Sequence, residues 1–315
     1  MAKNPIQFQK GYSLPKFLKS YGSEEQCRAK LFKYRWPNGF ECPKCGHNHC
    51  YELKTRKLFQ CTHCRYQCSL TSGTIFDSTQ LPLTVWFLAI FLLTQTKPGI
   101  SGLTLRRFLG ISVNASQKLK HKLQHVMKVS EDKRLLEGFI ELDDAYWGGK
   151  KGGGKRGRGA PGKTPFLAAV SRNEEGHPIH MKMSKLAAFN SGEILSWSRR
   201  HLCADAFVIS DAFNPFNCLS GLVAVHGQIK ASKIYENPEN RIFYWVNTMI
   251  SNVKRSIGGT YHAISHKHLP RYLAEFCFRF NNRFIIGAMV NQLIKLAVKA
   301  KPAPLRILTQ AEIEG

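Results

Sequence analysis

Two pairs of cysteines at metal-binding spacing are the feature that most constrains the fold of this chain. Cys42 and Cys45 form one C-x-x-C pair, Cys61 and Cys64 form a second, and fifteen residues separate the two pairs. Zinc takes four thiolates in a tetrahedron, and each tight C-x-x-C turn supplies two of them. The spacing therefore predicts a zinc ribbon over residues 39–72, with one structural Zn²⁺ ion bound by these four cysteines.

The residues around these pairs disfavour other kinds of cysteine chemistry. A redox C-x-x-C motif of the thioredoxin type lies in a βαβ unit, and neither pair has that context. The chain starts with MAKNPIQFQKGYSLPK, which lacks the apolar stretch of an export signal, so we expect residence in the cytoplasm, where disulfides are rare. We expect the other nearby candidates to be surface or core residues: His47, His49, Cys50, His63 and Cys68.

A large surplus of positive charge is the second constraint. Lys and Arg number 46 against 21 Asp and Glu, which gives a formal charge of +25. A surplus of this size repels itself in a compact fold and is relieved by an anionic partner. DNA or RNA is the expected partner, because phosphate contacts supply most non-specific affinity. On charge alone, a merely basic protein of the ribosome-associated kind is the alternative.

One apolar run, LPLTVWFLAIFLL at 81–93, raises the question of a membrane. A helix needs about 20 apolar residues to span a bilayer, and this run is shorter. We therefore expect a buried core helix and no membrane partner.

The remaining chain divides by pattern into a helical segment at 1–38, a helical module at 79–130 and a large unit at 136–315. Within the module, Gly110 separates LTLRRFL from a basic amphipathic segment, as in a helix-turn-helix. A plain helical hairpin with a solvated basic face is the alternative. In the helix-turn-helix interpretation, the side chains expected to face DNA are Arg106, Arg107, Lys118, Lys120, His121 and Lys122.

The large unit alternates strand-like and helix-like patterns, which predicts the α/β class. We expect a helix over 191–202 with Ser191 as its N-cap, and another over 241–257 that ends before Gly258 and Gly259. The expected strands are 138–142, 166–171, 178–183 and 206–210. A segment rich in Gly and basic residues, 148–162, is expected to become ordered on DNA.

Asp143 and Asp211 each end a short apolar run of this unit. Carboxylates at neighbouring strand ends can meet in one cleft and share two Mg²⁺ ions about 3.5–4 Å apart. Adjacent strand residues point to opposite faces, so only one of Asp143 and Asp144 is expected to reach the metals, with Glu141 in reserve. A strand-end aspartate can also be only a helix cap.

Several long motifs resemble those of zinc-ribbon insertion-sequence transposases of the ISXO-like family: RWPNGFECPKCG, ELDDAYWGG, VISD and GTYHAISHKHLPRYLAEF. The resemblance extends over nearly the whole chain. It implies an RNase-H-like catalytic domain preceded by the zinc ribbon and the small helical module. The implied activity is that of a DNA transposase, which binds transposon terminal inverted repeats and target DNA as a homo-oligomer. Mg²⁺ or Mn²⁺ is its implied catalytic metal.

The resemblance also assigns site residues. Asp143 and Asp211 match the first two catalytic carboxylates, and Asn247, seven residues before Lys254, matches the third position. Many related enzymes carry Glu there, whereas Asn offers one neutral oxygen and is a weaker Mg²⁺ ligand. Lys254 lies two helical turns further on the same face and is expected to hold a DNA phosphate. Glu236 and Glu239 are outside possibilities for the third ligand.

Three alternatives stay open from the sequence. The chain can be a DNA-binding protein of transposase ancestry that no longer cuts, an RNase-H-type nuclease that only hydrolyses, or a zinc-ribbon transcription factor. The last would not need paired aspartates on a large α/β unit. Four histidines are expected to pack or to contact DNA rather than bind metal: His226, His262, His266 and His268.

Overall fold

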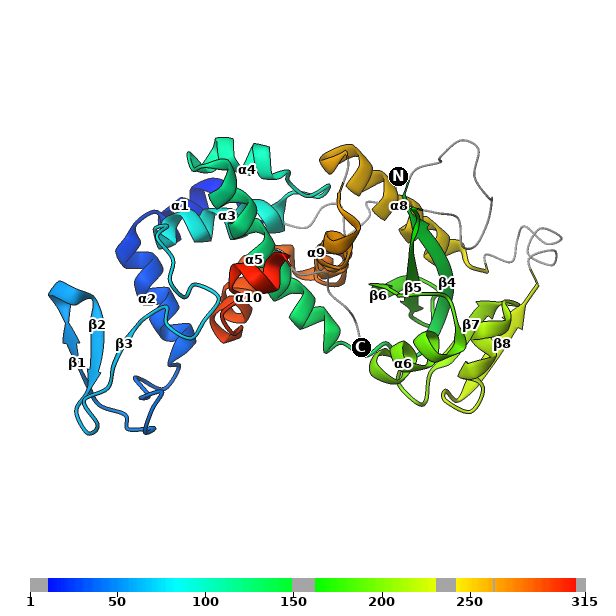
Figure 1. Ribbon diagram of the computed structural model, residues 1–315, viewed down its shortest axis with the longest axis horizontal. Helices are drawn as coiled ribbons and strands as arrows, with labels where there is room; N and C mark the ends of the chain where they lie inside the picture. The colour runs from blue at the N-terminus through cyan, green and yellow to red at the C-terminus, as the bar shows by residue number, and fades with distance from the viewer. Residues whose placement is uncertain (1–10, 149–161, 231–241, 263, 310–315) are drawn as a thin grey trace. The chain divides into compact units, whose positions relative to one another are not determined.

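The structure is a computed structural model that describes residues 11–148, 162–230, 242–262 and 264–309. The chain packs as two compact units, which Figure 1 shows as ribbons. The first unit contains the chain up to Met127 together with Asn282–Thr309, and the second contains Lys128–Asn281.

The first unit begins with two capped helices that support the cysteine-rich segment. Helices α1 (Leu14–Tyr21) and α2 (Glu24–Arg35) start at serine N-caps, and α2 confirms the helix expected there. A three-stranded antiparallel sheet follows, in the order β1-β2-β3. The buried Phe59 ring of this sheet lies 5.4 Å from the rings of both Phe32 and Trp36, centroid to centroid. The sheet elements are β1 (Cys50–Leu53), η1 (Lys54–Arg56), β2 (Leu58–Cys61) and β3 (Gln67–Ser69).

The helical module consists of α3 (Leu83–Gln95), α4 (Gly102–Leu109) and α5 (Val113–Asp132). The apolar run forms the buried helix α3, and no helix of the described residues is long and apolar enough to cross a membrane. Gly110 ends α4 in the left-handed conformation, with φ 64°, as the expected turn requires.

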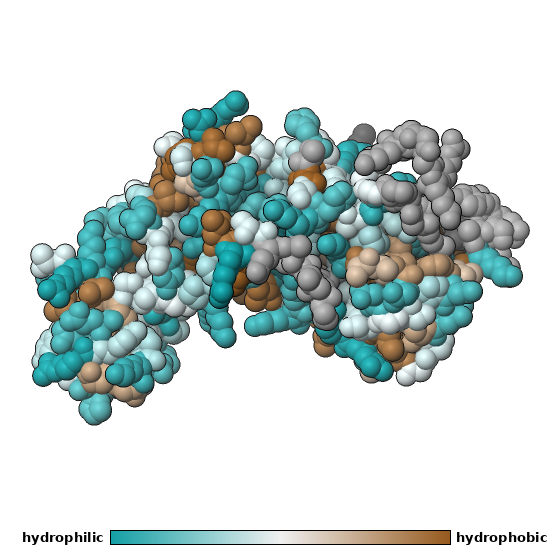
Figure 2. All heavy atoms as spheres, in the orientation of Figure 1, coloured by the Kyte–Doolittle hydropathy of each residue, from teal (hydrophilic) through white to brown (hydrophobic). Residues whose placement is uncertain are grey.

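The surface of this module differs from the expected one. Arg106, Arg107 and Lys118 are exposed, but Lys120 and Lys122 are buried, so the prediction that these two face DNA is wrong. Lys122 lies on the inner face of α5, where its ammonium group donates to the carbonyl oxygens of Ile75 and Asp77. Outside, α4 exposes the apolar Leu103 and Phe108, and hydrophobic residues gather over this helix in Figure 2.

The C-terminal helices α10 (Ile286–Lys299) and α11 (Leu305–Thr309) belong to the first unit. The sequence placed them with the large unit of 136–315, and the structure differs because α10 packs against α2 and α3. Its buried stripe is apolar at helical spacing, and it includes Met289, Val290, Leu293, Ile294 and Ala297.

The second unit is built on a five-stranded mixed sheet in the order β6-β5-β4-β7-β8. The β4–β5 and β5–β6 pairs are antiparallel, whereas the β4–β7 and β7–β8 pairs are parallel. This confirms the α/β prediction and matches the strand–strand–strand–helix–strand order expected of an RNase-H-like fold. The strands are β4 (Phe139–Trp147), β5 (Thr164–Arg172), β6 (Pro178–Lys185), β7 (Phe207–Asp211) and β8 (Val225–Ile229).

Helices cover both faces of this sheet. The side chains of Ile140 and Leu142 pack with α6 (Ser191–His201) and η2 (Asn214–Leu219) on one face. On the other face, Ala145 and Ala168 pack with α8 (Tyr244–Tyr261) and α9 (Leu269–Asn281). Short 3₁₀ turns precede α9 and α10: η3 (His266–His268) and η4 (Arg283–Ile285).

Two helix boundaries differ from their predictions. The N-cap of α6 is Asn190 and not Ser191, because the Asn190 side chain accepts the Glu193 N–H at 2.8 Å. Helix α8 continues through Gly258 and Gly259 to Tyr261. Its last turn is anchored by the Tyr261 hydroxyl, which donates to the buried Glu275 carboxylate.

A buried carboxylate joins the central strand to α8. Glu141 on β4 is 0% exposed, and one carboxylate oxygen accepts the Val246 N–H in the first turn of α8 at 2.9 Å. The other oxygen pairs with the Arg172 guanidinium at 3.1 Å. Burial raises the pKa of Glu141, whereas the Val246 amide and Arg172 favour its charged form. The carboxylate thus satisfies the amides at the α8 N-terminus and fixes that helix against β4.

The edge strand β6 is covered by side-chain hydrogen bonds. The Asn281 amide accepts the Met181 N–H at 2.8 Å and donates to the Met181 carbonyl at 2.9 Å. It also donates to the Glu131 carboxylate at 2.6 Å. Beside it, the Lys182 ammonium group donates to the Glu131 carbonyl and to His201 Nδ1, and burial lowers the pKa of His201 to about 3, which leaves the ring neutral. These bonds join the ends of α5 and α9 to the edge of the sheet.

Replacement of Glu141 by alanine should destabilise the second unit. The change leaves Arg172 without its buried partner and the first turn of α8 without its acceptor, so we expect the free energy of unfolding to fall by about 3 kcal/mol. Urea denaturation followed by circular dichroism measures this loss. Glu174→Ala, at an exposed position in the turn after β5, should change it by less than about 0.5 kcal/mol. Equal unfolding free energies for the two variants would contradict the anchoring role.

Candidate functional site

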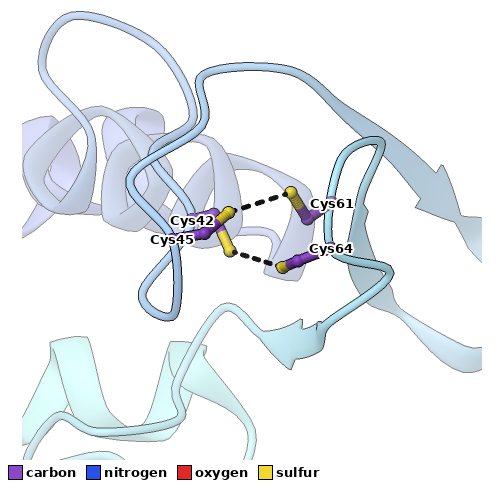
Figure 3. A group of neighbouring side chains, drawn as sticks. All are labelled: Cys42, Cys45, Cys61 and Cys64. Atoms are coloured by element: carbon purple, nitrogen blue, oxygen red, sulfur yellow. Dashed lines mark hydrogen bonds between the residues drawn. The ribbon is translucent and has the colours of Figure 1, made fainter.

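The four cysteines predicted to bind zinc converge in the structure. Cys42 and Cys45 lie in the turn before β1, while Cys61 ends β2 and Cys64 lies in the turn that follows it. The sulfur atoms of Cys42 and Cys64 are 3.6 Å apart, those of Cys45 and Cys61 are 3.7 Å apart, and all four lie within 4.8 Å of one another (Figure 3). Tetrahedral zinc with Zn–S bonds of about 2.3 Å requires sulfur–sulfur distances of about 3.8 Å, so the cluster fits a zinc ion.

Both knuckles have the same backbone turn. The Gly46 N–H donates to the Cys42 carbonyl at 2.9 Å, and the Arg65 N–H donates to the Cys61 carbonyl at 3.2 Å. The donor residue is left-handed in each case, with φ 73° at Gly46 and φ 60° at Arg65. Glycine adopts this conformation without steric cost, which explains Gly46 directly after the first pair.

The knuckle backbone also favours a thiolate. Burial raises the pKa of Cys42, but hydrogen bonds from the backbone amides of Cys45 and Lys44 outweigh it and lower that pKa to about 7. Zinc binds the thiolate form, so these amides favour metal binding. Within the described residues, the ligand group at this place contains the four cysteines, and the neighbouring histidines and Cys50 and Cys68 lie outside it.

The two predicted aspartates meet on neighbouring strands, with Asp211 at the end of β7 and Asp143 in the middle of β4, which continues to Trp147. Strands β4 and β7 are parallel, and their last paired residues are Leu142 and Ser210, directly before Asp143 and Asp211. Each of Asp143, Asp144 and Asp211 offers a carboxylate oxygen, and these oxygens lie within 4.8 Å of one another. All three residues are half-buried. Such a group of oxygen ligands can bind a divalent cation.

Asp144 is the residue that sequence reasoning misplaced. Strand alternation predicted that only one of Asp143 and Asp144 would reach the site, and the structure brings both carboxylates into the cluster. The pairing of β4 with β7 ends at Leu142. Beyond that residue β7 does not lie beside β4, so side chains from both faces of β4 can reach the same place. The Asp144 N–H also donates to Asp143 Oδ1 at 2.8 Å. The adjacent pair of acids at a strand end was the sequence signal for a joint role.

Helix α8 carries the two other predicted residues. Burial lowers the pKa of Lys254, and attraction to Asp143 opposes this shift. The Lys254 ammonium group also lies 5.9 Å from the centre of the Phe166 ring. Asn247 lies two turns earlier on the same face and is exposed. Its side chain makes no hydrogen bond to another residue that the structure describes, so its role as a metal ligand stays a prediction.

The remaining candidates have other places. Glu141 serves the α8 N-terminus and lies outside the carboxylate cluster. His226 forms a hydrogen bond with Ser210 Oγ at 2.9 Å, His266 with Thr164 Oγ1, and His268 with Arg271 at 3.0 Å. His262 follows the end of α8. Glu236, Glu239 and residues 149–161 of the predicted DNA-ordered segment lie outside the described residues.

Comparison with known proteins identifies both halves of this arrangement. An ISXO2-like transposase domain model matches residues 135–281, and a transposase zinc-ribbon domain model matches residues 22–67. An uncharacterized protein in transposable element ISH50 of Halobacterium salinarum is 27% identical over 161 residues, which cover 49% of this chain and 52% of that protein. The match thus spans about half the length of that relative.

A solved structure of a pre-cleavage Mos1 transpososome aligns with 66% of this chain and 77% of that chain, at 8% identity and a TM-score of 0.25, which is too low to carry a structural argument. The family models decide the assignment. The zinc-ribbon match contains the four converging cysteines, and the transposase-domain match contains the aspartate cluster with Asn247 and Lys254. Residues 135–281 and 22–67 are therefore similar to ISXO2-like transposase domains and to transposase zinc ribbons, respectively.

Proposed function

We propose that this protein is an active DNA transposase, which binds insertion-sequence ends and catalyses metal-dependent strand cleavage and strand transfer. The observation that carries the proposal is the convergence of Asp143 and Asp211 from adjacent parallel strands. The match of residues 135–281 to an ISXO2-like transposase domain supports the same reaction.

Asp143 and Asp211 would hold the catalytic divalent metal, Mg²⁺ or Mn²⁺. Three carboxylates within 4.8 Å repel one another, and a bound cation relieves that repulsion. When bound, two such ions would activate the attacking water or 3′-hydroxyl and stabilise the leaving oxygen. Asp144 would add a carboxylate to the ligand set. Asn247 would complete the set with a neutral oxygen, which binds Mg²⁺ more weakly than a carboxylate does.

Lys254 has the complementary task. An ammonium group near the carboxylates attracts the scissile phosphate, which carries a negative charge of its own. The phosphate would then be held between Lys254 and the metal ions bound by the acidic cluster. Such placement of the reacting groups before the chemical step lowers the entropic part of the barrier.

The four cysteines would hold one structural Zn²⁺, and the ribbon of 39–72 would act with the helical module of 79–130 in binding DNA. In this proposal the segment 1–38 supports the ribbon and the region 136–315 contains the catalytic sheet. Closed zinc sites with four thiolates have no open position for chemistry, so the metal stabilises the ribbon fold. We further propose a homo-oligomer at the paired transposon ends, and residence in the bacterial cytoplasm. The exposed basic residues Arg106, Arg107 and Lys118 support a DNA-binding role for the module.

Zinc content tests the ribbon. The purified protein should contain about one zinc ion per chain, and Cys45→Ser combined with Cys64→Ser should lose it, because each change removes a thiolate ligand. Atomic absorption measures the content. Cys50→Ser combined with Cys203→Ser, two half-buried cysteines outside the ligand group, should retain one zinc. Unchanged zinc in the first variant would overturn the ligand assignment.

Cleavage of a labelled transposon end in Mg²⁺ tests the carboxylates. Asp143→Ala and Asp211→Ala should each reduce the cleavage rate by about 10³-fold or more, since a bound metal contributes several kcal/mol of transition-state stabilisation. Binding of the same DNA should stay nearly intact. Asn247→Ala should lose less, because it removes a neutral ligand, and Asp144→Ala measures the role of the third acid. Asp205→Ala, at an exposed position outside the cluster, is the matched control.

The same assay separates the alternatives. Full cleavage by Asp143→Ala or Asp211→Ala would contradict the assigned site. A wild-type chain that binds ends without cutting them would be an inactive protein of transposase ancestry. Cleavage without any product joined to target DNA would identify a nuclease of the RNase H type.

A further inference from the structure

We infer that an open basic groove in the first unit binds the phosphate backbone of duplex DNA. The groove has a volume of about 580 Å³ and is formed by α1, α2 and the start of α10. Its residues lie outside the predicted ribbon of 39–72 and the helical module of 79–130, although those on α2 fall within the zinc-ribbon match of 22–67. This inference rests on the proposed transposase function and identifies a DNA-binding surface that the function alone does not specify.

Three lysines give the groove its charge. Lys16 on α1 and Lys30 and Lys33 on α2 line it, and the described residues that line it include no Asp or Glu. None of the three forms an ion pair with a described carboxylate. The Glu24 carboxylate at the start of α2 is engaged elsewhere, because it accepts the N–H groups of Leu83 and Thr84. The groove therefore keeps its positive charge for an external anion.

Aromatic rings hold two of these lysines without neutralising them. The Lys16 ammonium group lies 5.6 Å from the centre of the Tyr12 ring, and that of Lys30 lies 4.8 Å from the Tyr34 ring. A cation above an aromatic face is restrained in position and keeps its charge. The lysines are thus partly ordered before an anion arrives, which reduces the entropy lost on binding.

The walls of the groove suit a sugar-phosphate backbone. Gln26, Lys30 and Lys33 follow one face of α2 at helical spacing, and Ser20 and Asn291 add polar groups. The Tyr21 hydroxyl donates to Asn291 Oδ1 at 2.5 Å and joins α1 to α10. The small residues Ala29 and Gly287 leave room for a close approach.

Other occupants fit the groove less well. Pockets for small organic ligands are mostly apolar with few polar groups, whereas this one presents three ammonium groups. Lysine, hydroxyl and amide side chains commonly contact the phosphates and sugars of DNA. Such contacts position a duplex but do not recognise its base sequence. We therefore assign duplex DNA as the occupant, with sequence-independent contacts.

Salt dependence of DNA binding by the full chain is the test. Each phosphate contact contributes about 0.9 to the slope of the logarithm of the binding constant against the logarithm of salt concentration. Lys16→Gln combined with Lys30→Gln and Lys33→Gln should therefore reduce this slope by up to about 3. Fluorescence anisotropy with a labelled transposon-end duplex and an unrelated duplex of equal length measures it. Both duplexes should weaken equally, because phosphate contacts carry no base information.

Two further triple variants serve as controls. Lys19→Gln with Lys299→Gln and Lys301→Gln removes the same charge from exposed lysines of the same unit outside the groove, and it should change the slope by less than 1. Lys16→Arg with Lys30→Arg and Lys33→Arg keeps the charge and should keep the slope. Circular dichroism checks that each variant is folded.

The outcomes separate this inference from the proposed function. Equal slopes for the groove variant and the charge-matched control, with DNA bound by both, would overturn the groove and leave the transposase proposal standing. An acidic protein partner would then be the occupant to seek. Failure of the wild-type chain to bind either duplex would overturn both proposals.

Discussion

The buried carboxylate of Glu141 controls how the catalytic half of this protein is assembled. It lies two residues before Asp143 on the same strand, and it receives the first turn of α8, the helix that carries Asn247 and Lys254. A shift of α8 along the sheet would leave the Val246 amide without its acceptor and the carboxylate without its donor in a buried place, which is costly. The hydrogen bond from Val246 to Glu141 therefore fixes where α8, and with it Lys254, lies against β4.

The residues that sequence reasoning located well are those whose role is local. The C-x-x-C turns need only a few neighbouring residues, so their spacing was enough to predict the cluster of four sulfur atoms. The strands before Asp143 and Asp211 are short apolar runs, and a parallel pair brings their ends together wherever the rest of the chain lies. The turn at Gly110 needs one left-handed residue and was equally visible.

The features that could not be predicted from the sequence depend on contacts between distant segments of the chain. The sequence shows that Lys120 and Lys122 are charged, and for that reason both were predicted to face DNA. It does not show that the Lys122 ammonium group donates to the carbonyl oxygens of Ile75 and Asp77, which lie far away in the sequence. Asp144 joins the acidic cluster because the β4–β7 ladder ends one residue before Asp143, which depends on the length of another strand. Likewise, α10 belongs to the first unit and not to the predicted unit of 136–315, because its apolar stripe packs against α2 and α3.

The hydrogen bonds of Asn281 have a consequence for how copies of this protein can associate. An uncovered edge strand exposes amide and carbonyl groups that can recruit a strand from another molecule. At β6, Asn281 already occupies both the N–H and the carbonyl of Met181, and α9 packs against the strand. Edge-to-edge pairing through β6 would have to break these bonds first. The sheet is thereby protected at this edge against intermolecular β-sheet growth.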